Sequence, residues 1–281
     1  MFMQFFGFRT NPFSKEIKTD NLFISEDCNE LYSRLKFLEQ VRGYGVLVGE
    51  PGTGKTTAIR RYLTSLPPSL FQSVYFPLAT LTVREFIREL ALSLGEEPSY
   101  RKGESIRKIQ KAIANLYYER RITPVIVLDE LHLASTAVLS ELRLIFNFNM
   151  DSENPFIVIL AGQPALRVVL SYNIHTPLRQ RIALVHTMRG LAKEETSKYI
   201  ESRLKMAGCT EPLFSESACA AIHSITNGWP RLVNSIATNC LLYACENKQR
   251  HIDEQAVYYA QGELHSLARG EVARELHVQA L

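Results

Sequence analysis

The feature that most constrains the fold is a glycine-rich string between an apolar run and a helical pattern. The run covers residues 45–48, the helical pattern begins near Thr57, and the string reads Gly49-Glu50-Pro51-Gly52-Thr53-Gly54-Lys55-Thr56. Its glycines let the backbone curl, so that consecutive N–H groups and the N-terminus of the next helix face one anion. The string and its flanks predict a phosphate-binding loop. The alternative is a glycine-rich turn with a chance Lys-Thr pair, and the strand and helix on the correct sides argue against it.

The residue types in this loop predict the ligand. We expect Lys55 to contact the β- and γ-phosphates of a nucleotide and the Thr56 hydroxyl to bind Mg²⁺. ATP and Mg²⁺ are therefore the expected ligands. The residues assigned to nucleotide binding are Gly49, Glu50, Pro51, Gly52, Thr53, Gly54, Lys55, Thr56 and Thr57.

Short apolar runs alternate with helical patterns between Tyr44 and Met188, which predicts an α/β fold with a parallel sheet covered by helices on both faces. The expected strands cover residues 45–48, 73–76, 125–128, 156–160 and, more weakly, 182–187. Thr82 and Glu85 form a capping-box pattern that opens one of the intervening helices.

After Gly190 the chain shows helical patterns alone, at residues 193–206, 215–226, 230–246 and 253–262. We therefore expect a nucleotide-binding core at residues 1–190, a helical lid at 191–262 and a helical tail at 263–281.

Two carboxylates follow the third expected strand. Asp129 and Glu130 would lie at the carboxyl end of that strand, beside the phosphate loop. Asp129 is expected to hold Mg²⁺, which prefers oxygen ligands, and Glu130 to orient and polarise an attacking water. Two acids that merely cap a strand and open a helix are the alternative. His132 makes the string resemble a helicase box, a likeness that we treat as accidental because no second helicase core is visible.

Three further positions are candidate sensors of the γ-phosphate. Gln163 follows the fourth expected strand and is a candidate for the first sensor, or equally a turn residue. Arg181, with Arg179 in reserve, is the candidate finger that reaches the nucleotide of a neighbouring subunit. Arg231, after Pro230 at a helix start, is the candidate second sensor. Surface arginines remain the alternative for all three guanidinium groups.

Composition excludes several classes of protein. The net charge is only +3, from 32 Lys and Arg against 29 Asp and Glu, so no global field indicates nucleic acid or a membrane. No run approaches the length of a membrane span and no leader pattern opens the chain, so we expect a cytoplasmic protein without a membrane partner. The five cysteines lack a CxxC pair and indicate neither a disulfide framework nor a zinc site.

Taken together, these motifs resemble the ExeA/GspA-like branch of the AAA+ ATPases, which is close to transposition ATPases such as TnsC and MuB and to replication initiators. The acidic box of the branch reads Asp-Glu-Ala, and here Leu131 takes the Ala position. The stretches that carry the resemblance are Phe6-Gly7-Phe8, Asn11-Pro12-Phe13, the phosphate loop, Leu128-Asp129-Glu130, Leu142-Arg143-Leu144 with Asn147-Phe148, Ala161-Gly162-Gln163-Pro164, Arg179-Gln180-Arg181-Ile182, Tyr199-Ile200 with Arg203-Leu204 and Gly208, and Gly228-Trp229-Pro230-Arg231 with Asn234.

The resemblance implies an AAA+ core with a five-stranded parallel sheet, a C-terminal all-helical lid, and nucleotide held between the two. It also implies ATP-dependent self-assembly into a ring or a helical filament. By the same resemblance Asn11, Pro12 and Phe13 lie near the adenine, and Pro230 and Arg231 belong to the nucleotide site.

Three function classes stay open. The leading one is an accessory ATPase of DNA transposition that binds double-stranded DNA without sequence preference and regulates or recruits a DDE-type transposase. An ATPase of secretion and a nucleotide-dependent partner switch are the others, and Glu130 argues against the switch. The basic residues that would contact DNA, unless they only form a solvated face, are Arg101, Lys102, Arg107, Lys108 and Lys111.

Overall fold

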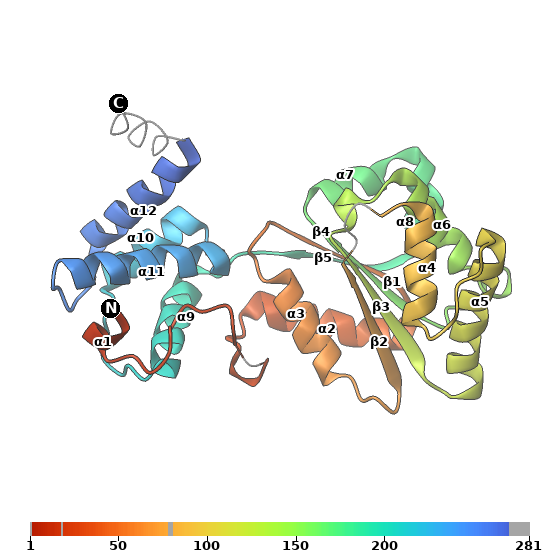
Figure 1. The fold of residues 1–281 in the computed structure, drawn as a ribbon, viewed down its shortest axis with the longest axis horizontal. Coiled ribbons are helices and arrows are strands. Elements are labelled where there is room, and N and C mark those ends of the chain that lie inside the picture. Colours follow the sequence, from red (N-terminus) through yellow and green to blue (C-terminus); the bar gives the residue numbers. More distant parts are fainter. Residues whose placement is uncertain (1, 18, 78–80, 270–281) are drawn as a thin grey trace. The chain divides into compact units, whose positions relative to one another are not determined.

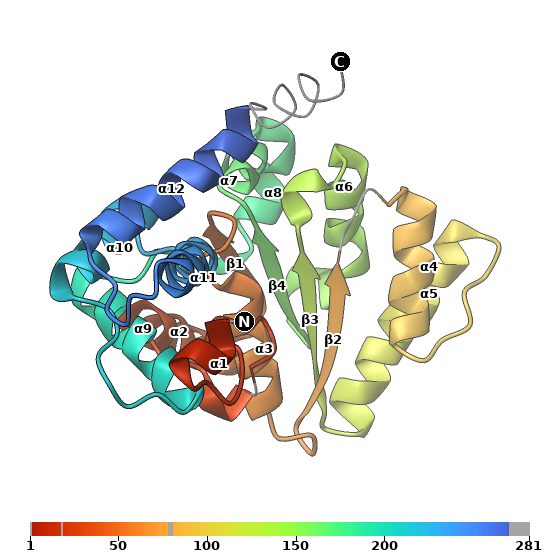
Figure 2. The same cartoon turned by 60° about the vertical axis from the view of Figure 1, so that its left-hand side comes forward.

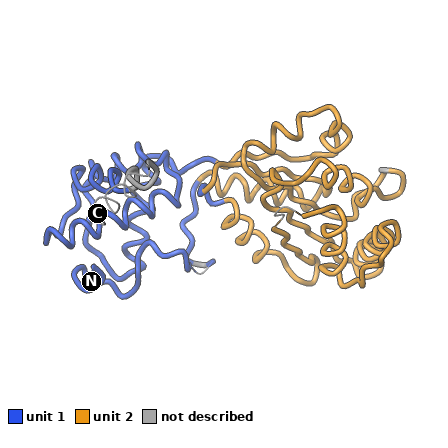
Figure 3. Tube along the Cα trace, turned by 45° about the horizontal axis from the view of Figure 1, so that its top comes forward, with its two compact units in different colours: residues 1–25, 52–54, 189–281 blue, residues 26–51, 55–188 orange. Residues whose placement is uncertain are grey.

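The computed structural model describes residues 2–17, 19–77 and 81–269 of the chain. These fall into two compact units (Figure 3). The core unit comprises residues 26–51 and 55–188, and the helical unit comprises residues 1–25, 52–54 and 189–281.

The core unit is built on a parallel sheet of five strands in the order β2-β3-β4-β1-β5 (Figures 1 and 2). The strands are β1 (Gly43–Gly49), β2 (Phe71–Pro77), β3 (Thr123–Asp129), β4 (Ile157–Gly162) and β5 (Ile182–Met188). All five expected strands are thus present, and the α/β prediction is confirmed.

Helices cover both faces of this sheet, because alternate residues of its central strands point to opposite sides. Val46 of β1 packs with α4 to α8 on one face, while the neighbouring Leu47 packs with α2 and α3 on the other. The helices of the core unit are α2 (Glu26–Val41), α3 (Lys55–Ser65), α4 (Val83–Ser93), α5 (Lys102–Ala114), α6 (Thr136–Ile145), α7 (Ala165–Ser171) and α8 (Thr176–Arg179). Short helical turns are η2 (Asn115–Glu119), η3 (Leu131–Leu133), η4 (Asn149–Asp151) and η5 (Asn173–His175).

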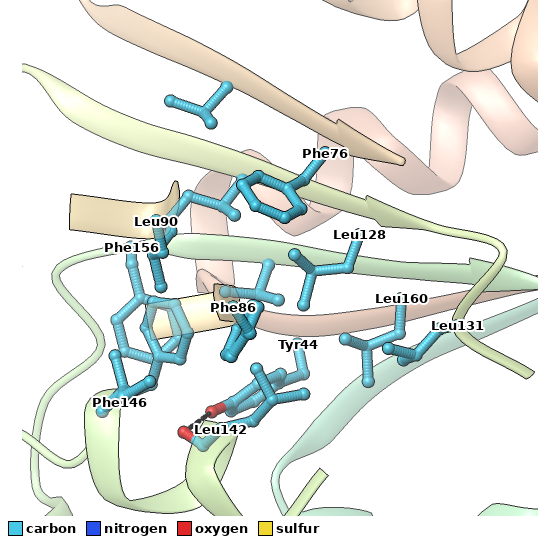
Figure 4. Packing of buried hydrophobic residues seen from close by; sticks show 14 of the residues in the cluster. Tyr44, Phe76, Phe86, Leu90, Leu128, Leu131, Leu142, Phe146, Phe156 and Leu160 are labelled. Atoms are coloured by element: carbon cyan, nitrogen blue, oxygen red, sulfur yellow. Dashed lines mark hydrogen bonds between the residues drawn. The ribbon is translucent and has the colours of Figure 1, made fainter. Parts of the chain in front are cut away.

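Aromatic packing anchors the sheet to α6. Tyr44 of β1 is fully buried and contacts Phe146 and Phe156 edge to face, with ring centroids 6.1 and 5.5 Å apart (Figure 4). Its hydroxyl donates to the carbonyl oxygen of Leu142 at 3.1 Å, which satisfies the one polar atom that this ring buries. The capping box of Thr82 and Glu85 is also present at the start of α4, as predicted.

The helical unit has a core of its own. Its elements are α1 (Phe2–Phe6), η1 (Thr19–Asn21), α9 (Lys193–Met206), α10 (Glu216–Thr226), α11 (Pro230–Glu246) and α12 (Glu254–Arg269). Phe6, Phe8 and Phe13 pack into this core beside apolar residues of α9 to α12. The N-terminal segment therefore contributes to the helical unit.

This arrangement corrects one assignment made from the sequence. Residues 1–25 were assigned to the core and instead belong to the helical unit, because the apolar partners of their phenylalanines lie on α9 to α12. The helical unit resumes at Arg189. Of the expected tail at 263–281, residues up to 269 continue α12, and 270–281 lie outside the described residues. None of the described helices combines the length and apolar character needed to cross a membrane.

Candidate active site

The phosphate loop connects β1 to α3. Gly52 and Gly54 have φ angles of +89° and +99°, a backbone conformation that side chains with a Cβ rarely adopt. Lys55 opens α3 and is 6% exposed. Its ammonium donates to the carbonyl oxygens of Gly49 (2.6 Å) and Glu50 (2.9 Å), so it is held over the loop. The loop thus has the backbone and the buried cation that a phosphate site requires.

The two expected metal ligands lie in direct contact. The Thr56 hydroxyl donates to Oδ2 of Asp129 at 3.0 Å, although 73 positions separate them in the chain. Asp129 ends β3 and is 2% exposed. A hydroxyl and a carboxylate are hard oxygen donors of the kind that Mg²⁺ takes, so these residues fit the ion. They would hold Mg²⁺ where it offsets the negative charge of bound phosphates.

Tyr75 is a member of this cluster that the sequence analysis missed. Its hydroxyl donates to the same Asp129 oxygen at 2.7 Å. Partial burial, followed by the hydrogen bond to Asp129, raises the pKa of Tyr75 above its usual range. The phenol therefore stays a protonated donor, and it restrains the carboxylate. Register could have indicated it, since Pro77 of β2 pairs with Asp129.

The other predicted groups of the hydrolytic step follow neighbouring strands. Gln163 comes directly after β4, whose Gly162 pairs with Val48 of β1. Glu130 comes directly after β3, which pairs with the other side of β4. The carboxyl ends of β1, β4 and β3 thus bring the phosphate loop, Gln163 and Glu130 to one edge of the sheet.

Both finger candidates lie away from this edge. Arg181 precedes β5, and Ile182 pairs with Tyr44 near the start of β1. The six residue steps of β1 span roughly 20 Å, so Arg181 is remote from the phosphate loop of its own chain. Its Nη1 donates to the carbonyl oxygen of Arg143 at 3.2 Å. Arg179 donates to the carbonyl oxygens of Leu170 (3.1 Å) and Ser171 (2.9 Å) at the end of α7, so its guanidinium is already committed.

The residues expected near the adenine base and the candidate second sensor all belong to the helical unit. Asn11 accepts a hydrogen bond from the Phe13 N–H at 3.0 Å, which turns the chain at Pro12. Pro230 occupies the first turn of α11, as predicted. The Arg231 N–H donates to the carbonyl oxygen of Gly52 at 3.3 Å, and both residues belong to this unit.

The candidate DNA contacts divide into two groups. Lys102 pairs with Glu141 of α6 at 2.6 Å, and Lys108 donates to the carbonyl oxygen of Glu97 at 3.0 Å. The side chains of Arg101, Arg107 and Lys111 are exposed on and beside α5. With Lys102, whose side chain is 53% exposed beside Glu141, four of the five cations therefore face solvent.

Comparison with known proteins finds an AAA domain in this chain. A sequence model of the AAA domain matches residues 38–170. The chain is 31% identical over 250 residues to General secretion pathway protein A of Aeromonas hydrophila. That alignment covers 87% of the chain but 45% of the relative, so the chain spans less than half of that protein.

Solved structures share the fold. Cdc6p of Pyrobaculum aerophilum matches with a TM-score of 0.67 at 20% identity, over 90% of this chain and 70% of its own. Drosophila ORC bound to DNA matches with a TM-score of 0.65 at 16% identity, over 94% of this chain and 66% of its own. The RuvB branch migration motor of Thermotoga maritima matches with a TM-score of 0.56 at 18% identity, over 91% of this chain and 74% of its own. At 20% identity or less, these solved structures show a shared fold. The match to the AAA domain model, with the assembled phosphate loop and acidic strand end, shows that the chain contains an AAA domain, as AAA+ ATPases do.

Proposed function

We propose that this chain hydrolyses ATP at the edge of the sheet formed by β1, β4 and β3, that ATP binding drives its assembly on DNA, and that hydrolysis releases the assembly. The observation that carries the hydrolytic part is the contact between Thr56 and Asp129 at 3.0 Å, because it joins the phosphate loop to the acidic strand end. Mg²⁺ held there supplies charge neutralisation. Lys55 binds the phosphates, Glu130 orients the attacking water, and Gln163 senses the γ-phosphate.

The position of Arg181 supports self-assembly. An arginine roughly 20 Å from its own phosphate loop reaches a γ-phosphate only if that nucleotide belongs to a neighbouring copy. Val168 on α7, Ile174 in η5 and Tyr172 between the two are each more than half exposed, which suits a surface covered by a second copy. In such an assembly Arg231 acts as the second sensor, and Asn11, Pro12 and Phe13 contact the adenine.

DNA is the proposed partner of the assembled state, and a DDE-type transposase is the protein that it regulates or recruits. The exposed cations Arg101, Arg107 and Lys111 support DNA binding, because such groups contact phosphates without reading sequence. Two structural relatives, Drosophila ORC and the ORC1 protein of Aeropyrum pernix, were solved in complex with DNA, which is a property of those two proteins.

An ATPase of secretion is the second candidate. The name of the A. hydrophila relative, General secretion pathway protein A, favours it. Secretion and transposition predict opposite responses to DNA, so one experiment separates them.

The test measures ATP turnover with and without double-stranded DNA at two salt concentrations. We expect DNA to stimulate turnover of the wild-type chain, and the stimulation to fall as salt rises. Glu130→Gln is expected to bind ATP, to lose turnover, and to sediment with DNA as a trapped assembly.

Charge-reversal variants locate the DNA contact. Arg107→Glu with Lys111→Glu on α5 should abolish the stimulation by DNA and leave basal turnover unchanged. Lys193→Glu with Lys198→Glu makes the same charge change at two exposed positions of α9 and should retain the stimulation. Turnover that DNA leaves unchanged at both salt concentrations would reject transposition in favour of the secretion candidate.

A further inference from the structure

His132 contacts two groups of the hydrolytic site. It lies in η3, directly after Asp129 and Glu130, and its side chain is 8% exposed. Its Nε2 lies 3.7 Å from Oε2 of Glu130, whose own side chain is 44% exposed. Its Nδ1 accepts a hydrogen bond from the backbone N–H of Gln163 at 3.4 Å. One buried ring therefore lies between the carboxylate after β3 and the residue after β4.

The hydrogen bond from Gln163 fixes the tautomer of the ring. A backbone amide only donates, so Nδ1 acts as the acceptor and carries no proton. The single proton of a neutral imidazole then resides on Nε2, the nitrogen that faces Glu130. The 3.7 Å separation is longer than a hydrogen bond, and the 44% exposure of the Glu130 side chain leaves room for its carboxylate to turn toward Nε2.

The backbone at both ends of this link is adapted to it. Glu130 has φ 56° and ψ 28°, a left-handed conformation that is uncommon for residues other than glycine. This turn directs the chain after β3 back toward β4. Opposite, a Cβ at Gly162 would lie 3.2 Å from the His132 backbone nitrogen and 3.4 Å from Nδ1. The absence of a side chain at position 162 leaves room for the ring.

We propose that His132 is a positioning residue for the hydrolytic step. Its Nε2–H holds the Glu130 carboxylate in the orientation that polarises the attacking water, and its Nδ1 ties that orientation to the backbone of Gln163. A displacement at the end of β4 then changes the orientation of Glu130 directly. This role rests on the proposed hydrolysis of ATP by this site.

The test compares kcat and KM for ATP in the full chain. His132→Ala should lower kcat about tenfold and change KM less than twofold, since the lost interaction acts on the transition state and not on ATP binding. His132→Gln should recover most of kcat, because one amide group can accept from Gln163 and donate to Glu130. His186→Gln is the matched control: His186 is also buried and lies 3.4 Å from a carboxylate, that of Asp27, but on β5, and its kcat should equal that of wild type.

A double variant separates positioning from a structural role. In single turnover, His132→Ala added to Glu130→Gln should cause no further loss, because the group that His132 orients is already gone. An equal loss on both backgrounds, or a wild-type kcat in His132→Ala, overturns the inference. A wild-type chain that does not hydrolyse ATP rejects the proposed function and this inference with it, whereas normal wild-type turnover with an unaffected His132→Ala rejects this inference alone.

Discussion

Oδ2 of Asp129 accepts hydrogen bonds from both Tyr75 and Thr56. When Thr56 turns to Mg²⁺, Tyr75 remains to hold the carboxylate in place. Tyr75→Phe removes that restraint and should weaken Mg²⁺ binding during turnover about fivefold, or about 1 kcal/mol, since Tyr75 is partly exposed and its bond is correspondingly screened. The measurement is the Mg²⁺ concentration that gives half-maximal ATP turnover.

Tyr258→Phe provides the control for this prediction. Tyr258 also donates to a carboxylate, that of Glu254 at 2.7 Å, but on the surface of α12. It should leave the Mg²⁺ requirement unchanged. Equal Mg²⁺ requirements in Tyr75→Phe and wild type would show that Tyr75 does not support the metal site.

The sequence could predict Lys55, Thr56 and Asp129 because each has a fixed place in a local motif. Tyr75 has no such motif: its contact with Asp129 depends on the register between β2 and β3, which is a non-local property. In the sequence, His132 shows only a likeness to a helicase box, which is accidental because no second helicase core is visible. Its contacts with Glu130 and Gln163 arise from the turn after β3.

Among the elements, α9 holds the N-terminal segment through one buried side chain. Arg203 is 3% exposed, and it donates to the carbonyl oxygens of Pro12 and Ser14, each at 2.6 Å. Arg203→Met would leave both carbonyl groups without these donors. It should lower the free energy of unfolding of the helical unit by about 3 kcal/mol, since hydrogen bonds to charged groups contribute about 1.5–3 kcal/mol each. Faster amide hydrogen exchange at residues 6–14 is the specific readout.

Lys205→Met on the same helix is the control, because the Lys205 side chain forms an exposed ion pair with Glu201 at 2.7 Å. Exchange at residues 6–14 should be unaffected in this variant. Slow exchange there in Arg203→Met as well would mean that the phenylalanines of the segment, and not Arg203, hold it in place.

Helix boundaries of the helical unit were accessible from the sequence because each helix has an apolar period and a local start signal, such as Pro230 before α11. The sequence does not show to which unit residues 1–25 belong. Phe6, Phe8 and Phe13 indicate burial, but the sequence does not say against which surface. Proximity to β1 along the chain favoured the core, while the apolar faces of α9 to α12 provide the actual partners.

For the whole molecule, the decisive prediction is that one copy completes the site of the next. Arg181 and Glu130 lie at opposite edges of the same sheet, so a finger that acts at all acts on a neighbour's nucleotide. Arg181→Ala alone should lose turnover about a hundredfold or more, by removal of the charge that stabilises the transition state. Glu130→Gln alone should also be inactive.

Mixing these two inactive variants should restore activity. A competent site then needs an Arg181→Ala copy, which retains Glu130, next to a Glu130→Gln copy, which retains Arg181. Random assembly of equal amounts places the two variants in that order at about a quarter of the interfaces. The mixture should therefore recover about a quarter of the wild-type turnover. Arg179→Ala alone should retain turnover, because the Arg179 guanidinium binds the end of α7 in its own chain and leaves Arg181 as the finger. A mixture of Arg181→Ala and Glu130→Gln that stays inactive, or an Arg181→Ala variant with wild-type turnover, would mean that the site is completed within one chain and that assembly serves partner binding alone.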